Sequence, residues 1–348
     1  MVVLGIETSC DETSVALLEE DGAIRSNVVA SQMRTHARFG GVVPELAARE
    51  HLANLPPVFE AALASARAQL SDVGLIAATA GPGLIGPLLV GLSAAKALAF
   101  GRGIPLMPVN HLEGHLYSSH LRAEGAPARP VELPFHGLVV SGGHAELVRV
   151  EPGGIAPIAR TRDDAPGEAF DKVARRAGLP YPGGPPIDRI AARGDGSRYP
   201  LPIGRPGDGS LDFSFSGLKT AMLREFERLG VDGSPLDPEA VGSDLADLFA
   251  SFQRAIVAAL VERVEAVRRS ERMRRLAVSG GVAANSELRS TLAAWGTTHG
   301  VEVLLPERAL TTDNAAMIAW AGLLRYRREG GTELGKATAR SRWPLGSP

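Results

Sequence analysis

Several features that would mark a specialised class of protein are missing from this sequence. Cysteine occurs only once in 348 residues, as Cys10. No disulfide can therefore form within the chain, which suits a reducing compartment. The N-terminus has no basic segment ahead of its apolar residues, which argues against a secretory signal. We therefore expect a cytoplasmic protein.

Long apolar runs are also missing. The most apolar stretch, residues 84–100, contains Gly86, Pro87, Gly91 and Lys96 and is too interrupted for a membrane span of about 20 residues. A hydrophobic share of 45% and a charged share of 22% are ordinary for a soluble globular chain. The length suffices for about two domains of roughly 150 residues each. We expect a globular protein with no membrane association.

The sequence also lacks an excess of basic residues. The formal net charge is −2, whereas a dedicated nucleic-acid-binding protein is usually strongly basic. Arginines nevertheless gather locally, and such clusters are more often solvated helix faces than nucleic-acid contacts. The clusters are Arg263, Arg268, Arg269, Arg272, Arg274 and Arg275; Lys172, Arg175 and Arg176; and Arg325, Arg327, Arg328, Lys336, Arg340 and Arg342.

What the sequence does contain is a repeated pattern of strands. Residues 2–6 and 14–18 are apolar runs that flank a polar turn, which predicts a hairpin. Residues 137–140 and 145–150 repeat this pattern about 135 residues later, which indicates a duplicated core with one copy in each of two lobes. Between and after the hairpins, helical and strand patterns alternate. This order predicts an α/β protein with a cleft between its lobes, and ligands at the carboxyl ends of strands.

The remaining elements follow from periodicity and from Gly and Pro signals. We place the first lobe at 1–110 plus 325–348 and the second at 111–324, and we expect a long functional loop at 181–215. The expected strands are 73–80, 106–109 and 275–278, and the expected helices are 43–68, 87–100, 111–121, 167–177, 245–269, 283–295 and 314–328.

Two histidines, His111 and His115, are four residues apart and lie on one face of the helix expected there. This spacing lets both imidazoles reach one metal ion. A zinc peptidase would carry its general-base glutamate directly after the first histidine. Leu112 occupies that position, so a metal site is plausible and a peptidase site is poorly supported. Taken alone, the pair could instead be hydrogen-bonded helix residues.

Four turns rich in glycine follow or flank predicted strands. Glycine lets a ligand approach the backbone closely, and a turn that leads into a helix presents free N–H groups to an anion. No Walker A pattern is present, so a P-loop nucleoside triphosphatase is not indicated. The two Ser-Gly-Gly turns, each after an apolar strand, nevertheless favour a nucleotide-binding cleft. The turns are Gly81-Pro82-Gly83, Ser141-Gly142-Gly143, Pro182-Gly183-Gly184 and Ser279-Gly280-Gly281.

These motifs belong to a series that runs in order along nearly the whole chain. Its members are residues 5–14, 44–51, 81–86, 110–115, 140–144, 167–172, 181–184, 279–285 and 312–319. The series resembles the bacterial TsaD family, the tRNA N6-adenosine threonylcarbamoyltransferases, whose members were formerly described as sialoglycoprotein endopeptidases. The resemblance implies a two-lobed fold like those of actin, Hsp70 and sugar kinases, with a duplicated RNase H-like core.

The resemblance also implies an activity and its partners. The threonylcarbamoyl group would pass from threonylcarbamoyl-AMP to N6 of adenosine 37 in tRNAs that read codons starting with adenine, with release of AMP. The partners would be the tRNA anticodon loop and two further subunits, TsaB and TsaE. The cofactor would be one Fe²⁺ or Zn²⁺ per subunit.

Matched residue by residue, the resemblance makes His111, His115 and Asp313 the metal ligands. Asp313 could otherwise be the N-cap of the helix that follows it. Asp11 and Glu12 are weak candidates for the base that takes the N6 proton. The chain departs from the family pattern at Pro166 and at Arg175-Arg176, and neither change removes a ligand. The implied contacts to the threonylcarbamoyl-adenylate are Val139, Val140, Ser141, Gly142, Gly143, Asp171, Gly184, Asp188 and Asn285.

Three of those donor contacts have simpler explanations. Asp171 and Asp188 could be ordinary carboxylates on a helix surface, although a ribose diol does need an acceptor of this kind. Asn285 could be the N-cap of the helix that follows it.

Overall fold

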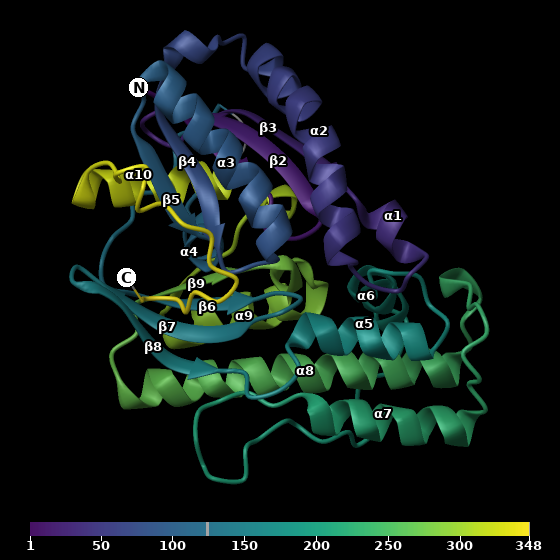
Figure 1. The fold of residues 1–348 in the computed structure, drawn as a ribbon. Helices are drawn as coiled ribbons and strands as arrows, with labels where there is room; N and C mark the ends of the chain where they lie inside the picture. Colours follow the sequence, from purple (N-terminus) through teal and green to yellow (C-terminus); the bar gives the residue numbers. More distant parts are fainter. Residues whose placement is uncertain (123–124, 348) are drawn as a thin grey trace. The chain divides into compact units, whose positions relative to one another are not determined.

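A computed structural model describes residues 1–122 and 125–347 (Figure 1). The chain divides into two compact units. Unit 1 comprises Met1–Glu132 and Pro306–Pro348, and unit 2 comprises Leu133–Leu305. Unit 2 is therefore an insertion between two segments that fold together.

Unit 1 contains a five-stranded sheet in the order β3-β2-β1-β4-β5. Strands β1 and β2 form the expected hairpin, and β1 pairs in parallel with β4. The elements are β1 (Val2–Glu7), β2 (Glu12–Leu18), β3 (Ile24–Ser31), α1 (Met33–Ala37), α2 (Pro44–Ser65), β4 (Val73–Gly81), α3 (Ile85–Arg102), β5 (Leu106–Asn110), α4 (His111–Ser118) and α10 (Ala315–Glu329).

Side chains along β1 point alternately to the two faces of this sheet, and the two faces contact different helices. Leu4 and Ile6 belong to the core under α2 and α3, whereas Gly5 faces α10, where a Cβ would lie 2.2 Å from the carbonyl oxygen of Ala315. Gly322 of α10 is packed equally tightly, since a Cβ there would lie 2.4 Å from Cβ of Ala77. Glycine at these two positions lets α10 lie directly on the strands.

Unit 2 repeats this architecture with the strand order β10-β9-β6-β7-β8. An antiparallel hairpin, β6 with β7, again pairs in parallel through its first strand, here with β9. In Figure 1, α7 and α8 run side by side along this unit. The elements are β6 (Phe135–Val140), β7 (Ala145–Glu151), β8 (Gly154–Arg160), α5 (Pro166–Arg176), α6 (Gly184–Ala191), α7 (Ser216–Leu229), α8 (Ser243–Ser270), β9 (Arg275–Ser279), α9 (Ser286–His299) and β10 (Glu302–Leu304).

The two strand orders are the same once corresponding strands are matched, because in each unit a meander of three strands is extended by two parallel ones. This confirms the α/β class and the duplicated core of the actin, Hsp70 and sugar-kinase fold.

The unit boundaries differ from those placed on the sequence. Residues 111–132 and 306–324, assigned above to the second lobe, lie in unit 1. The reason is close helix packing: α4 contacts α10, and a Cβ on Gly114 would lie 2.7 Å from Cδ1 of Ile318. Both predicted metal histidines thus belong to the same unit as Asp313.

The expected loop at 181–215 is wrong in part, because its beginning forms α6, from Gly184 to Ala191. Pro185 and Pro186 fall in the first turn of this helix, where proline is tolerated because its missing N–H would have no partner in any case. The Gly and Pro content that indicated a loop therefore marks a helix start.

Among the described helices, α3 is long and apolar enough to cross a membrane, judged by its length and composition alone. It packs against α2 and β4, and its buried Leu88, Leu92, Ala95 and Ala99 lie on one side of it. One such helix is weak evidence for a membrane span, because a helix that packs on the core of a soluble protein passes the same test.

Candidate functional site

The histidine pair is positioned by the start of α4. Asn110 ends β5 and caps the helix, since its side-chain oxygen accepts a hydrogen bond from the backbone N–H of Leu112 at 2.9 Å. Its amide nitrogen donates to the carbonyl of Trp343 at 3.0 Å, so the last part of the chain is tied to this cap. His111 and His115 follow on one helix face, with ring centroids 4.7 Å apart and ring planes at 84°.

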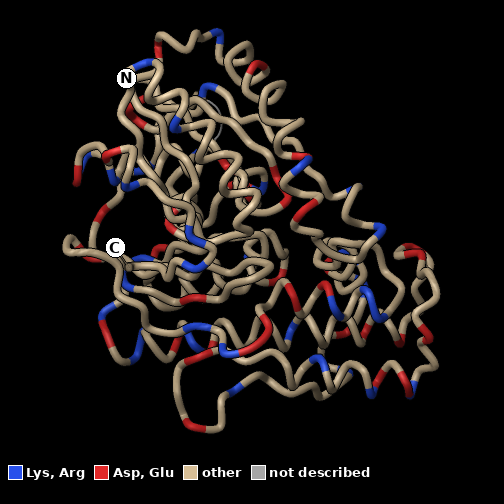
Figure 2. The backbone as a smooth tube through the Cα atoms, in the orientation of Figure 1, with Lys and Arg blue, Asp and Glu red and all other residues tan. Residues whose placement is uncertain are grey.

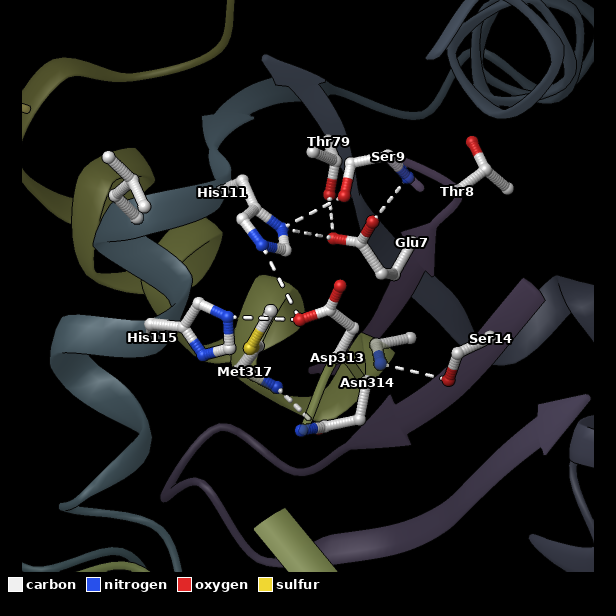
Figure 3. Close-up of polar contacts among 12 residues, drawn as sticks. Glu7, Thr8, Ser9, Ser14, Thr79, His111, His115, Asp313, Asn314 and Met317 are labelled. Carbon is white, nitrogen blue, oxygen red and sulfur yellow. Dashed lines mark hydrogen bonds and ion pairs between the residues drawn. The ribbon is translucent and has the colours of Figure 1, made fainter. Parts of the chain in front are cut away.

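Asp313 comes from the segment just before α10. Its position in the sequence allowed it to be the N-cap of that helix. The N-cap is instead Asn314, whose side chain accepts a hydrogen bond from the N–H of Met317 at 3.1 Å. Asp313 is left to face the histidines, as Figure 3 shows. Its Oδ1 lies 3.0 Å from Nε2 of His115 and 3.5 Å from Nε2 of His111.

This geometry fits a metal ion. One possible ligand atom from each of His111, His115 and Asp313 lies within 4.8 Å of the others. Ligands bound tetrahedrally at 2.0–2.1 Å would lie about 3.3 Å apart, close to the two measured separations. Two imidazoles and a carboxylate suit Fe²⁺ or Zn²⁺, and three ligands leave a position open for a substrate.

A buried carboxylate, Glu7, lies behind His111. Glu7 ends β1 and is fully buried. Its Oε2 lies 3.0 Å from Nδ1 of His111 and accepts a hydrogen bond from the hydroxyl of Thr79 at 2.6 Å, while its Oε1 accepts from the N–H of Ser9. Burial alone would raise the pKa of this carboxyl, but the charge and hydrogen bond of His111 lower it.

Glu7 is not among the predicted site residues, although it lies in the first motif of the series. One signal was available. A carboxylate that closes an otherwise apolar strand with every residue buried needs a partner inside the protein.

Two neighbouring carboxylates change the pKa of His111. Burial disfavours its charged form, but Asp313 and Glu7 outweigh this and raise its pKa to about 9. The metal-free site therefore holds a proton at neutral pH that a metal ion must displace.

Asp11 and Glu12, the weak candidates for a base, lie at the turn between β1 and β2. Oε1 of Glu12 accepts a hydrogen bond from the hydroxyl of Ser31 at 3.2 Å. Burial, followed by the charges of Asp313 and Asp11, raises the pKa of Glu12 to about 10. In the metal-free protein Glu12 is thus a neutral acid at pH 7, and it must ionise before it can accept a proton.

In unit 2 three glycine-bearing segments meet. A Cβ on Gly280 would lie 2.3 Å from the carbonyl oxygen of Val140, so the turn after β9 touches the end of β6. The N–H of Gly167, at the start of α5, donates to the carbonyl of Ser141 at 3.2 Å. A Cβ on Gly142 or Gly143 would meet no atom within 4 Å, so one side of this turn is open, while the N–H of Ser141 donates to the carbonyl of His144 at 2.9 Å.

The predicted donor carboxylates have protein partners close by. Asp171 accepts from the N–H of Gly183 at 2.7 Å, and this holds the turn that leads to Gly184. Asp188, on α6, accepts from Nδ2 of Asn285 at 3.2 Å. Both carboxylates remain partly exposed on their helices.

Asn285 is the N-cap of α9, as its simpler explanation predicts, and it accepts from the N–H of Leu288 at 3.0 Å. It also contacts Gln253 and Asp188, so capping is only part of its environment. The structure thus brings Asp171 next to Gly184, and Asp188 next to Asn285.

The basic clusters are largely paired within the chain. Arg268 and Arg269 both bind Glu265, each with a nitrogen–oxygen distance of 2.8 Å. Lys172 binds Asp164 and Glu168. Figure 2 shows acidic residues interspersed with basic ones along much of the chain. These pairings favour the solvated-face interpretation of the clusters that contain Arg268 and Lys172.

Comparison with known proteins extends this description. A family model described as TsaD, tRNA N6-adenosine threonylcarbamoyltransferase, matches residues 23–320. A protein named tRNA N6-adenosine threonylcarbamoyltransferase from Geobacillus thermodenitrificans is 49% identical and covers 93% of this chain and 91% of its own length. One of the same name from Geobacter sulfurreducens is 48% identical over 99% of this chain and 97% of its own.

Solved structures support the fold alone, because their identities are low. HypF from T. kodakarensis superposes with a TM-score of 0.59 at 14% identity, covering 94% of this chain and 48% of its own. Component A of (R)-2-hydroxyglutaryl-CoA dehydratase from Acidaminococcus fermentans gives a TM-score of 0.53 at 14% identity, covering 94% of this chain and 98% of its own.

Proposed function

Because the chain belongs to the TsaD family of tRNA N6-adenosine threonylcarbamoyltransferases, we propose that it modifies adenosine 37 of tRNAs that read codons starting with adenine. The donor in this proposal is threonylcarbamoyl-AMP. N6 of the adenine attacks the carbamoyl carbon, the bond from that carbon to the phosphate oxygen breaks, and AMP leaves. The single observation that carries the proposal is the convergence of His111, His115 and Asp313 in a chain of this family.

The donor is proposed to bind in unit 2, on the turn after β6. Backbone N–H groups of Gly142 and Gly143 would hold the phosphate and stabilise the negative charge that develops on departing AMP, while the N–H of Ser141, which donates to the carbonyl of His144 at 2.9 Å, would hold the shape of the turn. The open surroundings of Gly142 and Gly143 support this. The other proposed contacts are Val139, Val140, Asp171, Gly184, Asp188 and Asn285.

One metal ion, Fe²⁺ or Zn²⁺, is proposed to bind His111, His115 and Asp313. When bound, it would supply a Lewis acid that orients the donor and polarises its carbonyl. The protein's own part is to hold the three ligands at suitable separations and to keep His115 and His111 buried. Positioning should supply much of the rate, because an aromatic amine is a poor nucleophile.

The N6 proton needs an acceptor, for which Asp11 and Glu12 remain the weak candidates. Glu12 qualifies only once it is ionised, since burial and the neighbouring carboxylates favour its neutral form. Adenine 37 must leave the stack of the anticodon loop to reach the site, because a stacked base presents no accessible N6. We further propose a cytoplasmic location and association with TsaB and TsaE.

The test is reconstitution with purified chain, TsaB, TsaE, synthetic threonylcarbamoyl-AMP and unmodified tRNA, followed by mass spectrometry of the nucleosides. We expect N6-threonylcarbamoyladenosine to appear, together with stoichiometric AMP. Casein and ATP are added in separate reactions. Cleavage of casein or consumption of ATP without any modified nucleoside would contradict the proposal in favour of a peptidase or a kinase.

A further inference from the structure

We propose that Glu7 is a positioning residue that fixes the tautomer of His111 and thereby sets the affinity of the metal site. The inference rests on the metal site proposed above and assigns a role to a residue outside its ligand set. Glu7 is fully buried and touches one of the two histidines only.

The two ring nitrogens of His111 face different partners. Nε2 faces Asp313, at 3.5 Å from Oδ1, and Nδ1 faces Glu7, at 3.0 Å from Oε2. An ionised carboxylate is purely an acceptor, so this contact requires the proton on Nδ1. The lone pair of the neutral ring then lies on Nε2, the nitrogen that faces Asp313. A hydrogen bond from the far nitrogen of a ligating histidine to a carboxylate fixes the ring orientation and raises its basicity.

Glu7 is itself held in place from both oxygens. Oε2 accepts from the hydroxyl of Thr79 at 2.6 Å, and Oε1 accepts from the N–H of Ser9. These bonds come from neighbouring positions in unit 1, so the carboxylate cannot rotate without losing one of them. Its place on the Nδ1 side of His111 leaves it outside the group of possible ligand atoms.

His115 has no equivalent support. Its Nδ1 is buried and has no hydrogen-bond partner among the residues that the structure describes. Its Nε2 lies 3.0 Å from Oδ1 of Asp313. Only the imidazole of His111 is therefore held in one tautomer by a hydrogen bond. We assign His111 the role of the preorganised ligand of the site.

The hydroxyl of Ser9 is a second possible acceptor for the same proton, at 3.2 Å from Nδ1 of His111. A hydroxyl can also donate, however, and so does not select one tautomer. The carboxylate can only accept. Tautomer selection is thus assigned to Glu7 rather than to Ser9.

The experiment measures the affinity of the metal-free full-length chain for Zn²⁺ by competition with a chelator. Glu7→Gln is compared with the parent, with His111→Ala and His115→Ala, and with Glu113→Gln as the matched control. Glu113 is also a buried carboxylate and lies on α4 itself, but its charged neighbours are Arg325, Arg328 and Glu329.

We expect Glu7→Gln to weaken Zn²⁺ binding roughly 10–100-fold, the range typical for loss of such a supporting partner, while Glu113→Gln stays near the parent. If Glu7→Gln binds as the parent does while both histidine variants lose the metal, Glu7 has no positioning role but the metal site stands. If the histidine variants bind normally, the proposed site itself is wrong.

A second measurement reads the tautomer in the parent protein itself. In the zinc-loaded parent with ¹⁵N-labelled histidine, His111 should show a proton on Nδ1 and none on Nε2. His111→Ala identifies the signal by its loss. A bare Nδ1 on His111 in the loaded protein would overturn the inference.

Discussion

Nε2 of His115 lies 3.0 Å from Oδ1 of Asp313, although 198 residues separate them in the chain. Only the fold of unit 1 brings them together, because α4 packs against α10 through Gly114. The ligand geometry therefore depends on how these two helices pack, and we expect metal binding to be a property of unit 1.

Removal of a metal ligand should abolish metal binding. We expect His111→Ala or His115→Ala to lower bound metal well below one ion per chain and to abolish transfer. The melting temperature of His115→Ala should fall only modestly, because the cores of both units lie elsewhere, whereas that of His111→Ala should fall further, because the buried Glu7 loses its partner. Elemental analysis and thermal unfolding measure the two effects. His299→Ala is the control, since His299 lies in unit 2 near Glu265, and it should keep its metal.

The affinity for metal should rise with pH. Asp313 and Glu7 raise the pKa of His111 to about 9 against the opposing effect of burial, whereas the unfolded value is about 6.5. Zn²⁺ must displace this proton from the folded chain, so affinity should increase with pH until about pH 9, by at most tenfold per unit. Chelator competition across this range measures it, and a flat profile would contradict the assignment.

The raised pKa of His111 also makes the stability of the metal-free protein depend on pH. The folded state keeps the proton on His111 above the pH at which the unfolded state loses it. The stability that this proton contributes is fully present below about pH 6.5 and is lost as pH rises through about 9. Urea unfolding at several pH values should show this decline in metal-free protein and less of it in loaded protein.

Loss of Asp171 should weaken binding of the donor. Its bond to the N–H of Gly183 holds the turn before Gly184, so Asp171→Ala should cost AMP binding about 1–3 kcal/mol without changing metal content. Calorimetry with AMP measures this. Asp237→Ala removes a similar bond to a backbone N–H, that of Glu239, and should leave affinity intact. Equal affinities in all three proteins would remove Asp171 from the site.

Charge reversal on α8 should leave tRNA binding unchanged. Arg268 and Arg269 are occupied by Glu265, so Arg268→Glu with Arg269→Glu should not alter the dependence of tRNA affinity on salt. Each lost phosphate contact would reduce the slope of log affinity against log salt by roughly 0.7–0.9. A reduction of that size would place tRNA on this helix after all.

The elements predicted well are those with a strong apolar pattern. Both hairpins, the parallel strands β4, β5 and β9 and the helices α2, α3, α8 and α10 occur near their expected positions because each buries a face or a whole strand. The edge strands β3, β8 and β10 were not predicted, since they are only partly buried and lack clear alternation, and helix α7 was not predicted either. Helix α6 was hidden by its opening Gly and two prolines.

The site was predictable to a different extent. The spacing of His111 and His115 follows from helix geometry alone. No local pattern connects either residue with Asp313, and only the resemblance to a family supplied that ligand. Glu7 was overlooked because its role depends on a contact with His111 across 104 residues, and such contacts leave no trace in local periodicity.

The interrupted arrangement of unit 1 has a consequence for synthesis of the protein. Domains generally fold as units while the chain emerges from the ribosome, and unit 2 is complete at Leu305, before Asp313 has been made. The carbonyl of Trp343, which binds the cap of α4, is made later still. Unit 2 is thus able to fold first, while the proposed metal ligands meet only after Asp313 has been added. An ion held by His111, His115 and Asp313 would therefore bind after unit 2 has been made.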